Sequence, residues 1–434
     1  MSAGLVAFIL FGTFVGLIVL RIPVAFALAL ACIPIFFLEP RLTPILLLQE
    51  MFRSYNSFLL LAVPFFLLAA NLMNAAGITD RLIDLSRAMV GHLPGGLGHI
   101  NVMVSMFFAG ISGSSTADSA GIGSLLIPQM KRQGFHASFA VAITACSSVM
   151  GVIIPPSILM VVWGGLMSVS IGGLFLAGVV PGVLIGLTQM ATVYVYAKIY
   201  NYPIYARSTF LELLRALLSA SLALMTPLII VGGIVGGFFT PTEASVVAVL
   251  YSLVLGLFVY RTVGPAKLAG VLYDTARFAA ISLFCIGTAS AFGWLLAYFK
   301  VPATLVASVT AMGLGVTQMG FMVAVSFLVI GCFIDAIPAI IIMGTVLWPV
   351  TQAVGMHPIH FAIIGVMSLA FGLVTPPYGL CLLISCAIGE IRVMDALKDV
   401  AIILLPMLCI LAVVILFPGL ILALPRWLMP QFVG

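Results

Sequence analysis

The chain contains an ungapped internal repeat, in which residues 110–156 align with residues 331–377, 221 positions further on. Of the 47 aligned pairs 11 are identical, and seven of these are Gly or Pro. The identical pairs are Gly110/Gly331, Gly123/Gly344, Leu126/Leu347, Pro128/Pro349, Gly134/Gly355, His136/His357, Ile143/Ile364, Ser147/Ser368, Gly151/Gly372, Pro155/Pro376 and Pro156/Pro377. Gly permits backbone angles that other residues avoid, and Pro removes an N–H donor. The repeat therefore predicts the same backbone shape twice, with helices interrupted at matching places.

The composition places this repeat in a membrane. Hydrophobic residues make up 63% of the chain and charged residues only 7%, whereas soluble domains carry about a quarter charged residues. Apolar runs of about 20 residues, the length that crosses hydrocarbon, recur along the chain. They predict ten full spans, at about 4–20, 22–39, 57–76, 136–170, 172–197, 217–237, 241–260, 277–298, 359–390 and 400–424. Matched helix breaks in two halves of a membrane protein point to a transport site, so the chain is expected to move a solute.

Two further apolar segments are predicted to enter and leave the membrane on the same side. Residues 96–130 are interrupted at 110–118, the first tip, and residues 319–352 are interrupted at 331–338, the second tip. The flanks of each tip are only about 12–15 residues long, which is too short to cross. Such re-entrant hairpins need protein or a water-filled cavity around the turn, because lipid cannot satisfy a non-helical backbone.

These segments predict an all-α polytopic membrane protein with five spans and one hairpin in each half. An odd number of spans per half turns the second half over, so the repeat is expected to have inverted topology. The expected parts are a first repeat at 1–197 (hairpin 96–130, broken span 136–170), a cytoplasmic linker at 198–216 and a second repeat at 217–434 (hairpin 319–352, broken span 359–390).

The distribution of Lys and Arg agrees with this topology. With both termini on the periplasmic side, 13 of the 17 basic residues fall on the cytoplasmic side, as the positive-inside rule expects. Lys131 and Arg132 follow the first hairpin, but the uncharged Gln352 follows the second, so the hairpins should open to opposite sides. The net charge of +5 is spread over short loops and indicates topology rather than a nucleic-acid partner.

The first tip is rich in oxygen ligands. Its polar residues are Ser112, Ser114, Ser115, Thr116 and Asp118. Hydroxyls and the free carbonyls at a helix end suit a hard cation such as Na⁺, and a half-helix N-terminus suits a carboxylate. At the second tip Asp335 replaces Ser114 in the repeat, and an ionisable group at mid-depth is usually functional. The alternative is a face of small residues that only lets two helices pack closely.

Each broken span contains a tandem Pro. Residues 151–157, the first break, read GVIIPPS, and residues 372–378, the second break, read GLVTPPY. Two adjacent prolines remove two N–H donors and force the helix open, which frees the carbonyls of the preceding turn. A simple Pro kink is the alternative, although a kink needs neither the second Pro nor the Gly.

The remaining polar residues predict structural roles. Glu243 follows Pro241 at the start of a span, as expected at a helix N-terminus. His136 and His357 correspond in the repeat and fall at span entrances, which favours an interfacial position over a proton relay. There is no Walker A motif and no set of nucleophile, base and acid. The chain is therefore not expected to be an enzyme or an ATP-driven pump.

The strings GISGSSTADSAGIGSLLIPQM, GVIIPPS, GGFFTPTEAS and GLVTPPYG resemble the large membrane subunit of tripartite ATP-independent periplasmic (TRAP) transporters, over essentially the whole chain. The resemblance implies an ion-transporter-type elevator fold in a bacterial or archaeal cell (inner) membrane. It also implies Na⁺-coupled import of a carboxylate, such as a C4-dicarboxylate or sialic acid. The implied partners are the lipid bilayer, a small four-helix membrane subunit and a periplasmic substrate-binding protein.

Three sets of residues carry over from the family by resemblance. The first Na⁺ site would comprise Ser114, Ser115, Thr116, Gly151, Val152 and Pro155. The second would comprise Gly331, Asp335, Gly372, Thr375 and Pro376. The substrate would lie between the tips, near Ser114, Thr116, Pro156, Ser157, Asp335 and Pro377.

Two other classes of function remain open from the residues. A stand-alone Na⁺- or H⁺-coupled carboxylate carrier of the same ion-transporter group would share the tips and breaks. An intramembrane enzyme or a channel is less consistent with the pattern. An enzyme needs a catalytic pair, but Asp118 and Asp335 lie in different repeats, and a channel does not need a second, inverted tip.

Overall fold

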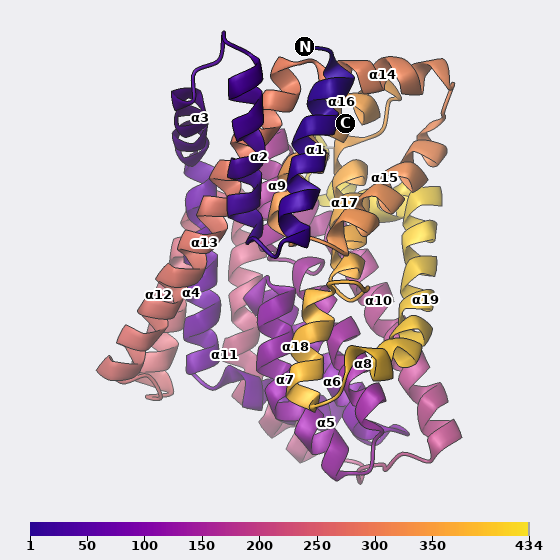
Figure 1. Ribbon diagram of the computed structural model, residues 1–434. Helices are drawn as coiled ribbons and strands as arrows, with labels where there is room; N and C mark the ends of the chain where they lie inside the picture. The colour runs from indigo at the N-terminus through magenta and orange to yellow at the C-terminus, as the bar shows by residue number, and fades with distance from the viewer. Residues whose placement is uncertain (433–434) are drawn as a thin grey trace.

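In the computed structural model, residues 1–432 are described and contain twenty α-helices and no strand (Figure 1). The first ten are α1 (Ala3–Val19), α2 (Val24–Leu38), α3 (Ile45–Tyr55), α4 (Ala62–Ala75), α5 (Ile78–Val90), α6 (Gly96–Ser112), α7 (Ser115–Arg132), α8 (Ala137–Ser148), α9 (Ile158–Met167) and α10 (Ile171–Tyr200). The second ten are α11 (Phe210–Val235), α12 (Pro241–Val254), α13 (Pro265–Tyr298), α14 (Val301–Ala311), α15 (Val316–Gly331), α16 (Ala336–Ala353), α17 (Pro358–Gly372), α18 (Leu380–Gly389), α19 (Val393–Leu416) and α20 (Pro418–Leu428). Short 3₁₀ or π turns lie at Phe58–Leu61, Val149–Val152, Leu255–Val259 and Pro430–Phe432.

The expected class of an all-α polytopic membrane protein is confirmed. In the described part of the chain, seven helical segments are long and apolar enough to cross a membrane alone. Six of them, containing α4, α10, α11, α12, α13 and α19, fall on expected spans. The other expected crossings are shorter, because α1 and α2 have 17 and 15 residues and each broken span consists of two half-helices.

The hairpin arms are longer than the sequence suggested. Both α7 and α16 have 18 residues, and α16 is the seventh segment that is long enough to cross. The arms are longer because the interruptions are shorter than the strings 110–118 and 331–338. Only Gly113 and Ser114 separate α6 from α7, so Ser115, Thr116 and Asp118 lie in the first turn of α7.

The helix boundaries repeat with the same offset as the sequence. Adding 221 to the bounds of α7 gives residues 336–353, which are the bounds of α16. In the same way His136 and His357 are the N-caps of α8 and α17, as expected for span entrances. Ser114 and Asp335 are the N-caps of α7 and α16.

The two sets of repeated helices occupy opposite ends of the molecule. In Figure 1, α6, α7 and α8 lie in the lower half together with α18, and α15, α16 and α17 lie in the upper half with α9. Both broken spans therefore pass through the middle in opposite directions. Helix α5 lies at the lower end and α14 at the upper end, each just before its hairpin in the chain.

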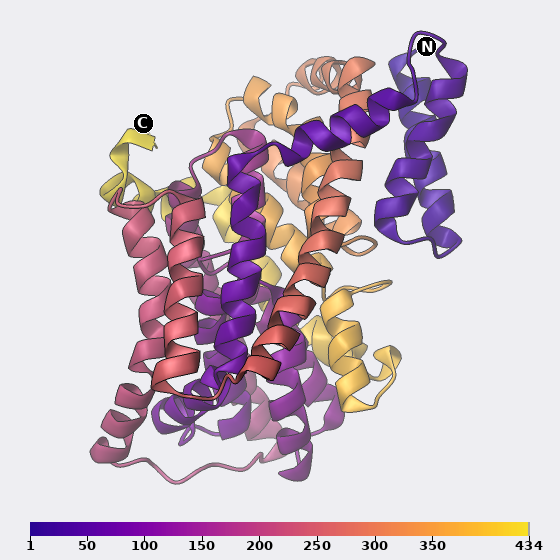
Figure 2. The ribbon, with the colours of Figure 1, turned by 90° about the vertical axis from the view of Figure 1, so that its left-hand side faces the viewer.

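The linker is shorter than the predicted 198–216. Helix α10 continues to Tyr200, and α11 already begins at Phe210. The early start has a local cause, because the Thr209 hydroxyl and the Glu212 carboxylate form a capping box. Thr240 and Glu243 form the same motif at the start of α12, which confirms the helix-terminal role of Glu243. Between α10 and α11, only residues 201–209 are non-helical. They lie at the end of the molecule opposite the N-terminus (Figures 1 and 2).

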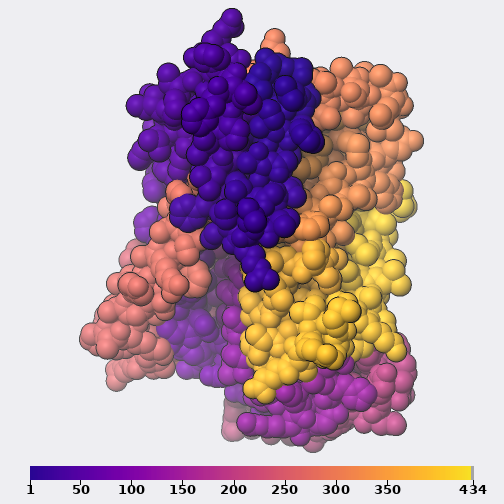
Figure 3. All heavy atoms as spheres, in the orientation of Figure 1, coloured from indigo at the N-terminus to yellow at the C-terminus, as the bar shows by residue number. Residues whose placement is uncertain are grey.

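Two short helices, α3 and α14, occupy segments that the sequence analysis left as loops, and α20 occupies the end of the span predicted at 400–424, because α19 already ends at Leu416. Figure 2 shows α3 running across the upper end, at a steep angle to α4. On the face shown in Figure 3, the N-terminal helices form the upper front surface and the segment around α18 lies below them. These helices have 11 residues each, too few for a crossing of about 20 residues.

Candidate functional site

The first tip packs directly against the first break. The Gly113 carbonyl accepts a hydrogen bond from the Ile158 N–H (3.3 Å), at the start of α9. Gly113 has a φ of +64° and ends α6 in the left-handed conformation that favours Gly. The Ser115 hydroxyl lies 3.5 Å from the Val149 carbonyl oxygen, in the turn that ends the lower half of the broken span. The tip thus meets backbone carbonyls of an opened helix.

Hydroxyl groups line the same contact. The Ser114 and Thr116 hydroxyls lie 3.1 Å apart, and both residues are half-buried. On the other side of the break, the Ser157 hydroxyl donates to the Val152 carbonyl (2.6 Å) and caps α9. Ser119 and Ser148 share a hydrogen bond of 2.6 Å between α7 and α8.

Asp118 is the one carboxylate in this contact. Its side chain is fully buried, and one oxygen, Oδ1, accepts a hydrogen bond from the Ser112 hydroxyl. The other oxygen, Oδ2, has no hydrogen-bond partner among the described residues. The Gly151 backbone lies close to Oδ2, and a Cβ on Gly151 would collide with this oxygen.

The second tip and second break also meet through glycine. A Cβ on Gly372 would lie 2.6 Å from the Gly331 carbonyl carbon, so the two backbones touch here. The Tyr378 N–H donates to the Cys332 carbonyl (3.0 Å) and ties the end of the break to the tip. The Thr375 hydroxyl, in the break, donates back to the Phe371 carbonyl near the end of α17 (2.7 Å).

The two halves differ in exposure, and Asp335 corrects an expectation. The sequence places Asp335 at mid-depth, at a helix break, where we expected a buried carboxylate that needs a partner. Its side chain accepts only from the adjacent Ala336 N–H (2.8 Å), and the residue is exposed. Pro376 and Pro377 are exposed as well, whereas Pro155 and Pro156 are buried. The first half is therefore closed around its tip, and the second half is open.

The structure brings most of the expected residues together. Ser114, Ser115 and Thr116 meet the first break near Gly151 and Val152, and Gly331 meets Gly372. Pro155 does not face the tip hydroxyls in the same way, because its carbonyl faces Gly110 of α6. Pro377 lies on the exposed side of the second break.

Three polar residues near the first tip were absent from the expected ligand sets: Ser112, Asp118 and Ser148. Asp118 was visible in the sequence as an acid in a hydroxyl-rich string, but only the fold shows that it is enclosed. At the start of α18, the Cys381 N–H donates to the Leu373 carbonyl of the second break (2.9 Å), and α18 also packs along α7 of the first hairpin. Helix α18 is thus a shared neighbour of the second break and the first hairpin.

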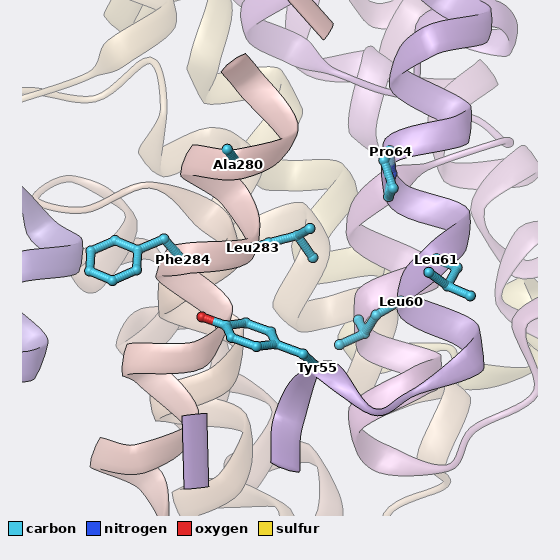
Figure 4. Close-up of a pocket in the computed structure, with 7 residues that line it drawn as sticks. All are labelled: Tyr55, Leu60, Leu61, Pro64, Ala280, Leu283 and Phe284. Carbon is cyan, nitrogen blue, oxygen red and sulfur yellow. The ribbon is translucent and has the colours of Figure 1, made fainter. Parts of the chain in front are cut away.

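A cavity of about 370 Å³ lies elsewhere, between α4 and α13 (Figure 4). Tyr55 points across it towards α13, and the lining residues are Tyr55, Leu60, Leu61, Pro64, Ala280, Leu283 and Phe284. No charged side chain lines it. An apolar cavity with one phenol does not offer the partners that a carboxylate or a cation requires.

Two hairpin tips that each contact a broken helix, inside an all-helical membrane protein, define a membrane carrier rather than an enzyme. The chain belongs to the tripartite ATP-independent periplasmic transporter family, DctM component, whose family model matches residues 11–420. Proteins of this family are multi-pass inner membrane subunits. They work with a small membrane subunit and a periplasmic substrate-binding protein.

Named relatives match the chain over most of its length. It is 35% identical to the sialic acid TRAP transporter large permease protein SiaM of Vibrio cholerae, over 95% of this chain and 96% of that protein. It is 36% identical to the C4-dicarboxylate TRAP transporter large permease protein DctM of Pseudomonas aeruginosa, over 87% and 89%. The isethionate TRAP transporter permease protein DctMQ of Oleidesulfovibrio alaskensis is 36% identical over 96% of this chain, which spans 66% of that longer protein.

A solved structure shares the fold at low sequence identity. The YdaH transporter of Alcanivorax borkumensis superimposes with a TM-score of 0.56, at 13% identity, over 81% of this chain and 85% of that one. At this identity the similarity concerns the fold alone.

Proposed function

We propose that the chain is the translocating subunit for Na⁺-driven import of an organic acid, such as a C4-dicarboxylate, sialic acid or a related carboxylate. One Na⁺ would bind between the first tip and the first break, and another between the second tip and the second break. The substrate would bind between the tips. Family membership favours this function over the stand-alone carrier that the residues left open.

The charge of the two tips carries the proposal. Across the two hairpins and two broken helices, the basic residues are His99, Lys131, Arg132, His136, His357 and His360. All lie near outer helix ends, while the tips contain the carboxylates Asp118 and Asp335. An anionic substrate would be repelled by such a site unless bound cations neutralise it. Hydroxyls and opened carbonyls are suitable ligands for Na⁺.

The carboxylate group of the substrate would find hydrogen-bond donors at the starts of the half-helices. Helices α7, α9, α16 and α18 all begin near the middle of the molecule. Free N–H groups and the positive end of the helix dipole favour an anion at such a helix start. We therefore expect the substrate to be held by backbone N–H groups and by the tip hydroxyls of Ser114 and Thr116.

The arrangement of the halves supports an elevator movement. The matching helix bounds and the opposite ends of α5 and α14 are consistent with inverted topology and with both termini in the periplasm. The hairpins and broken helices would slide as one body against the remaining spans. Helix α13, a remaining span, packs along hairpin helix α16 and provides a surface for that sliding. The open second tip and closed first tip would be one end state of the movement.

The direct test is uptake by proteoliposomes that contain both membrane subunits, with the binding protein supplied outside. A thermal-shift screen of the binding protein identifies the carboxylate to use. We expect an inward Na⁺ gradient to raise uptake at least about tenfold over Na⁺-free buffer, and each tenfold step of the Na⁺ concentration ratio supplies about 1.4 kcal/mol of driving force per ion. Collapse of the pH gradient alone should leave uptake intact. Uptake that follows the pH gradient without Na⁺ would contradict Na⁺ coupling and make His136 and Asp335 candidates for a proton relay.

A further inference from the structure

A half-buried arginine, Arg81 of α5, is held by neutral groups only. Its guanidinium carbon lies over the Tyr260 ring, 3.8 Å from the ring centre, and one of its N–H groups donates to the Ser219 hydroxyl of α11 (3.1 Å). In the described part of the chain, no ion pair includes Arg81. A guanidinium has five N–H donors, so most of those of Arg81 remain free for an anion.

Two further cations lie in the turn between α12 and α13, which faces the start of α5. Lys267, near the start of α13, donates to the carbonyl of Ala75 (2.7 Å), the last residue of α4. Arg261 follows Tyr260 in the chain and is exposed, and its Nε donates to a backbone carbonyl three residues earlier (3.4 Å). Neither residue takes part in an ion pair with any of residues 1–432. Together with Arg81 they form what we call the basic cluster.

The acids near the basic cluster do not neutralise it. Asp84 of α5 is paired with Arg87 (3.6 Å). Asp80 lies exposed in the first turn of α5, where the helix dipole favours a negative charge. Asp274 is also exposed, two turns further along α13 than Lys267. Three cations therefore face two unpaired acids, and a net positive charge remains.

The basic cluster lies where several membrane-crossing helices end. Helices α4, α11, α12 and α13 all belong to segments that are long and apolar enough to cross. The turn between α12 and α13 meets the junction of α4 and α5 in the lower half of the molecule (Figure 1). In the proposed topology this is the cytoplasmic side, where anionic phospholipids attract basic segments. The positive-inside rule explains why cations gather on this side, but it does not require an aromatic ring under Arg81.

Apolar surface continues from the basic cluster towards the middle of the membrane. Leu218 and Leu222 lie on one face of α11, Leu250 and Val254 lie on one face of α12, and all four are exposed. The two helices pack together, and the Tyr251 hydroxyl of α12 donates to the Leu222 carbonyl (2.7 Å). A phospholipid matches both parts, because its phosphate suits the cations and its acyl chains suit the apolar faces. A free phosphate ion would match the cations alone.

We propose that the basic cluster binds the phosphate of an anionic phospholipid, such as phosphatidylglycerol, with Arg81 as its main ligand and Tyr260 as the residue that positions Arg81. Arg is the side chain best suited to phosphate, because its planar fork can donate two hydrogen bonds at once. The assignment to the cytoplasmic leaflet rests on the proposed topology, whereas the lipid site itself does not depend on Na⁺ coupling. Helix α5 joins α4 to the first hairpin, so the lipid would fasten this joint to α11 and α12.

The test measures thermal unfolding of the purified complex of the two membrane subunits, in detergent and in potassium buffer without Na⁺. Phosphatidylglycerol, phosphatidylcholine or inorganic phosphate is titrated separately. Arg81→Gln removes the charge, and Arg81→Lys keeps the charge but removes the planar fork. Tyr260→Leu removes the ring, and Tyr260→Phe removes only a hydroxyl that has no hydrogen-bond partner among the described residues. Arg87→Gln is the matched control, because Arg87 lies on the same helix but is paired with Asp84.

We expect phosphatidylglycerol to stabilise the wild-type complex more than phosphatidylcholine does. Arg81→Gln should raise the phosphatidylglycerol concentration for half-maximal stabilisation about fivefold, the factor that corresponds to about 1 kcal/mol for one basic residue near an anionic lipid surface. Arg81→Lys and Tyr260→Leu should raise it by a smaller factor. Arg87→Gln and Tyr260→Phe should behave as the wild type.

Equal midpoints in Arg81→Gln and the wild type would overturn the inference and leave the basic cluster as a determinant of topology. Equal stabilisation by phosphatidylcholine would overturn it too, since the apolar faces alone would then bind lipid. Stabilisation by inorganic phosphate alone, to the same extent, would identify a site for the free ion instead. If Arg81→Gln cannot be purified, an unchanged midpoint in the double variant Arg261→Gln with Lys267→Gln overturns the inference. Because the buffer contains no Na⁺, none of these results depends on the proposed Na⁺ coupling.

Discussion

A disulfide between positions 293 and 345 is expected to stop transport completely and reversibly. Gly293 lies on α13 and Thr345 on α16, and a Cβ on Gly293 would be 3.9 Å from the Thr345 Cβ. This distance fits a disulfide without backbone movement. If α16 slides along α13 during each cycle, Gly293→Cys with Thr345→Cys should lose uptake on oxidation and recover it with reductant.

The background for this experiment is a chain with all seven native cysteines replaced, since each is a free thiol. The two single variants, oxidised in the same way, are the controls and should retain uptake. The Thr345 hydroxyl bonds only to carbonyls of its own helix, so its removal should not open the packing. Full uptake by the cross-linked double variant would show that α13 and α16 do not move apart, and the elevator would have to be replaced by a rocking movement.

Asp335→Asn is expected to abolish uptake or to raise the Na⁺ concentration for half-maximal uptake at least tenfold. Asn is as good an N-cap as Asp, so the hydrogen bond from the Ala336 N–H can persist while the charge is lost. A tenfold change in ion affinity corresponds to about 1.4 kcal/mol, an ordinary size for a lost charge contact. The measurement is the Na⁺ dependence of uptake in proteoliposomes.

Asp274→Asn, on the exposed part of α13, removes the same charge away from the tips and should leave the Na⁺ dependence unchanged. The Asp335→Asn variant should still insert and assemble with the small subunit, because the residue is exposed and packs little. Normal uptake with normal Na⁺ dependence would mean that Asp335 only caps α16. The second site would then consist of carbonyls alone.

The hairpins and breaks could be predicted because Gly and Pro act locally. Gly113, with a positive φ, and the prolines at 155 and 156 interrupt helices whatever surrounds them. The same local rules located His136, His357 and Glu243 at helix starts. The ends of the interruptions were placed too widely, because hydroxyl residues such as Ser115 and Thr116 are as suitable in a first helical turn as in a loop.

The burial of the two acids could not be predicted. Asp118 and Asp335 both lie next to apolar runs at mid-depth, and nothing in the sequence distinguishes the fully buried Asp118 from the exposed Asp335. Enclosure depends on which helices pack over the tip, and α18 packs on α7 from a distant part of the chain, together with the neighbouring α8. The short helices α3 and α14 were also missed, because their lengths fall below the apolar window that identifies a crossing.

The central claim is that the two hairpins enter the membrane from opposite sides. Two exposed glutamines mark the outer ends of the hairpins: Gln133, just after α7, and Gln352, at the end of α16, 219 positions further on. In a cysteine-free background, Gln133→Cys and Gln352→Cys are labelled in intact cells with a membrane-impermeant maleimide, before and after permeabilisation. We predict that position 352 reacts from the periplasm in intact cells and that position 133 reacts only after permeabilisation. Labelling of both positions from the same side would contradict the inverted arrangement on which the whole account of the site depends.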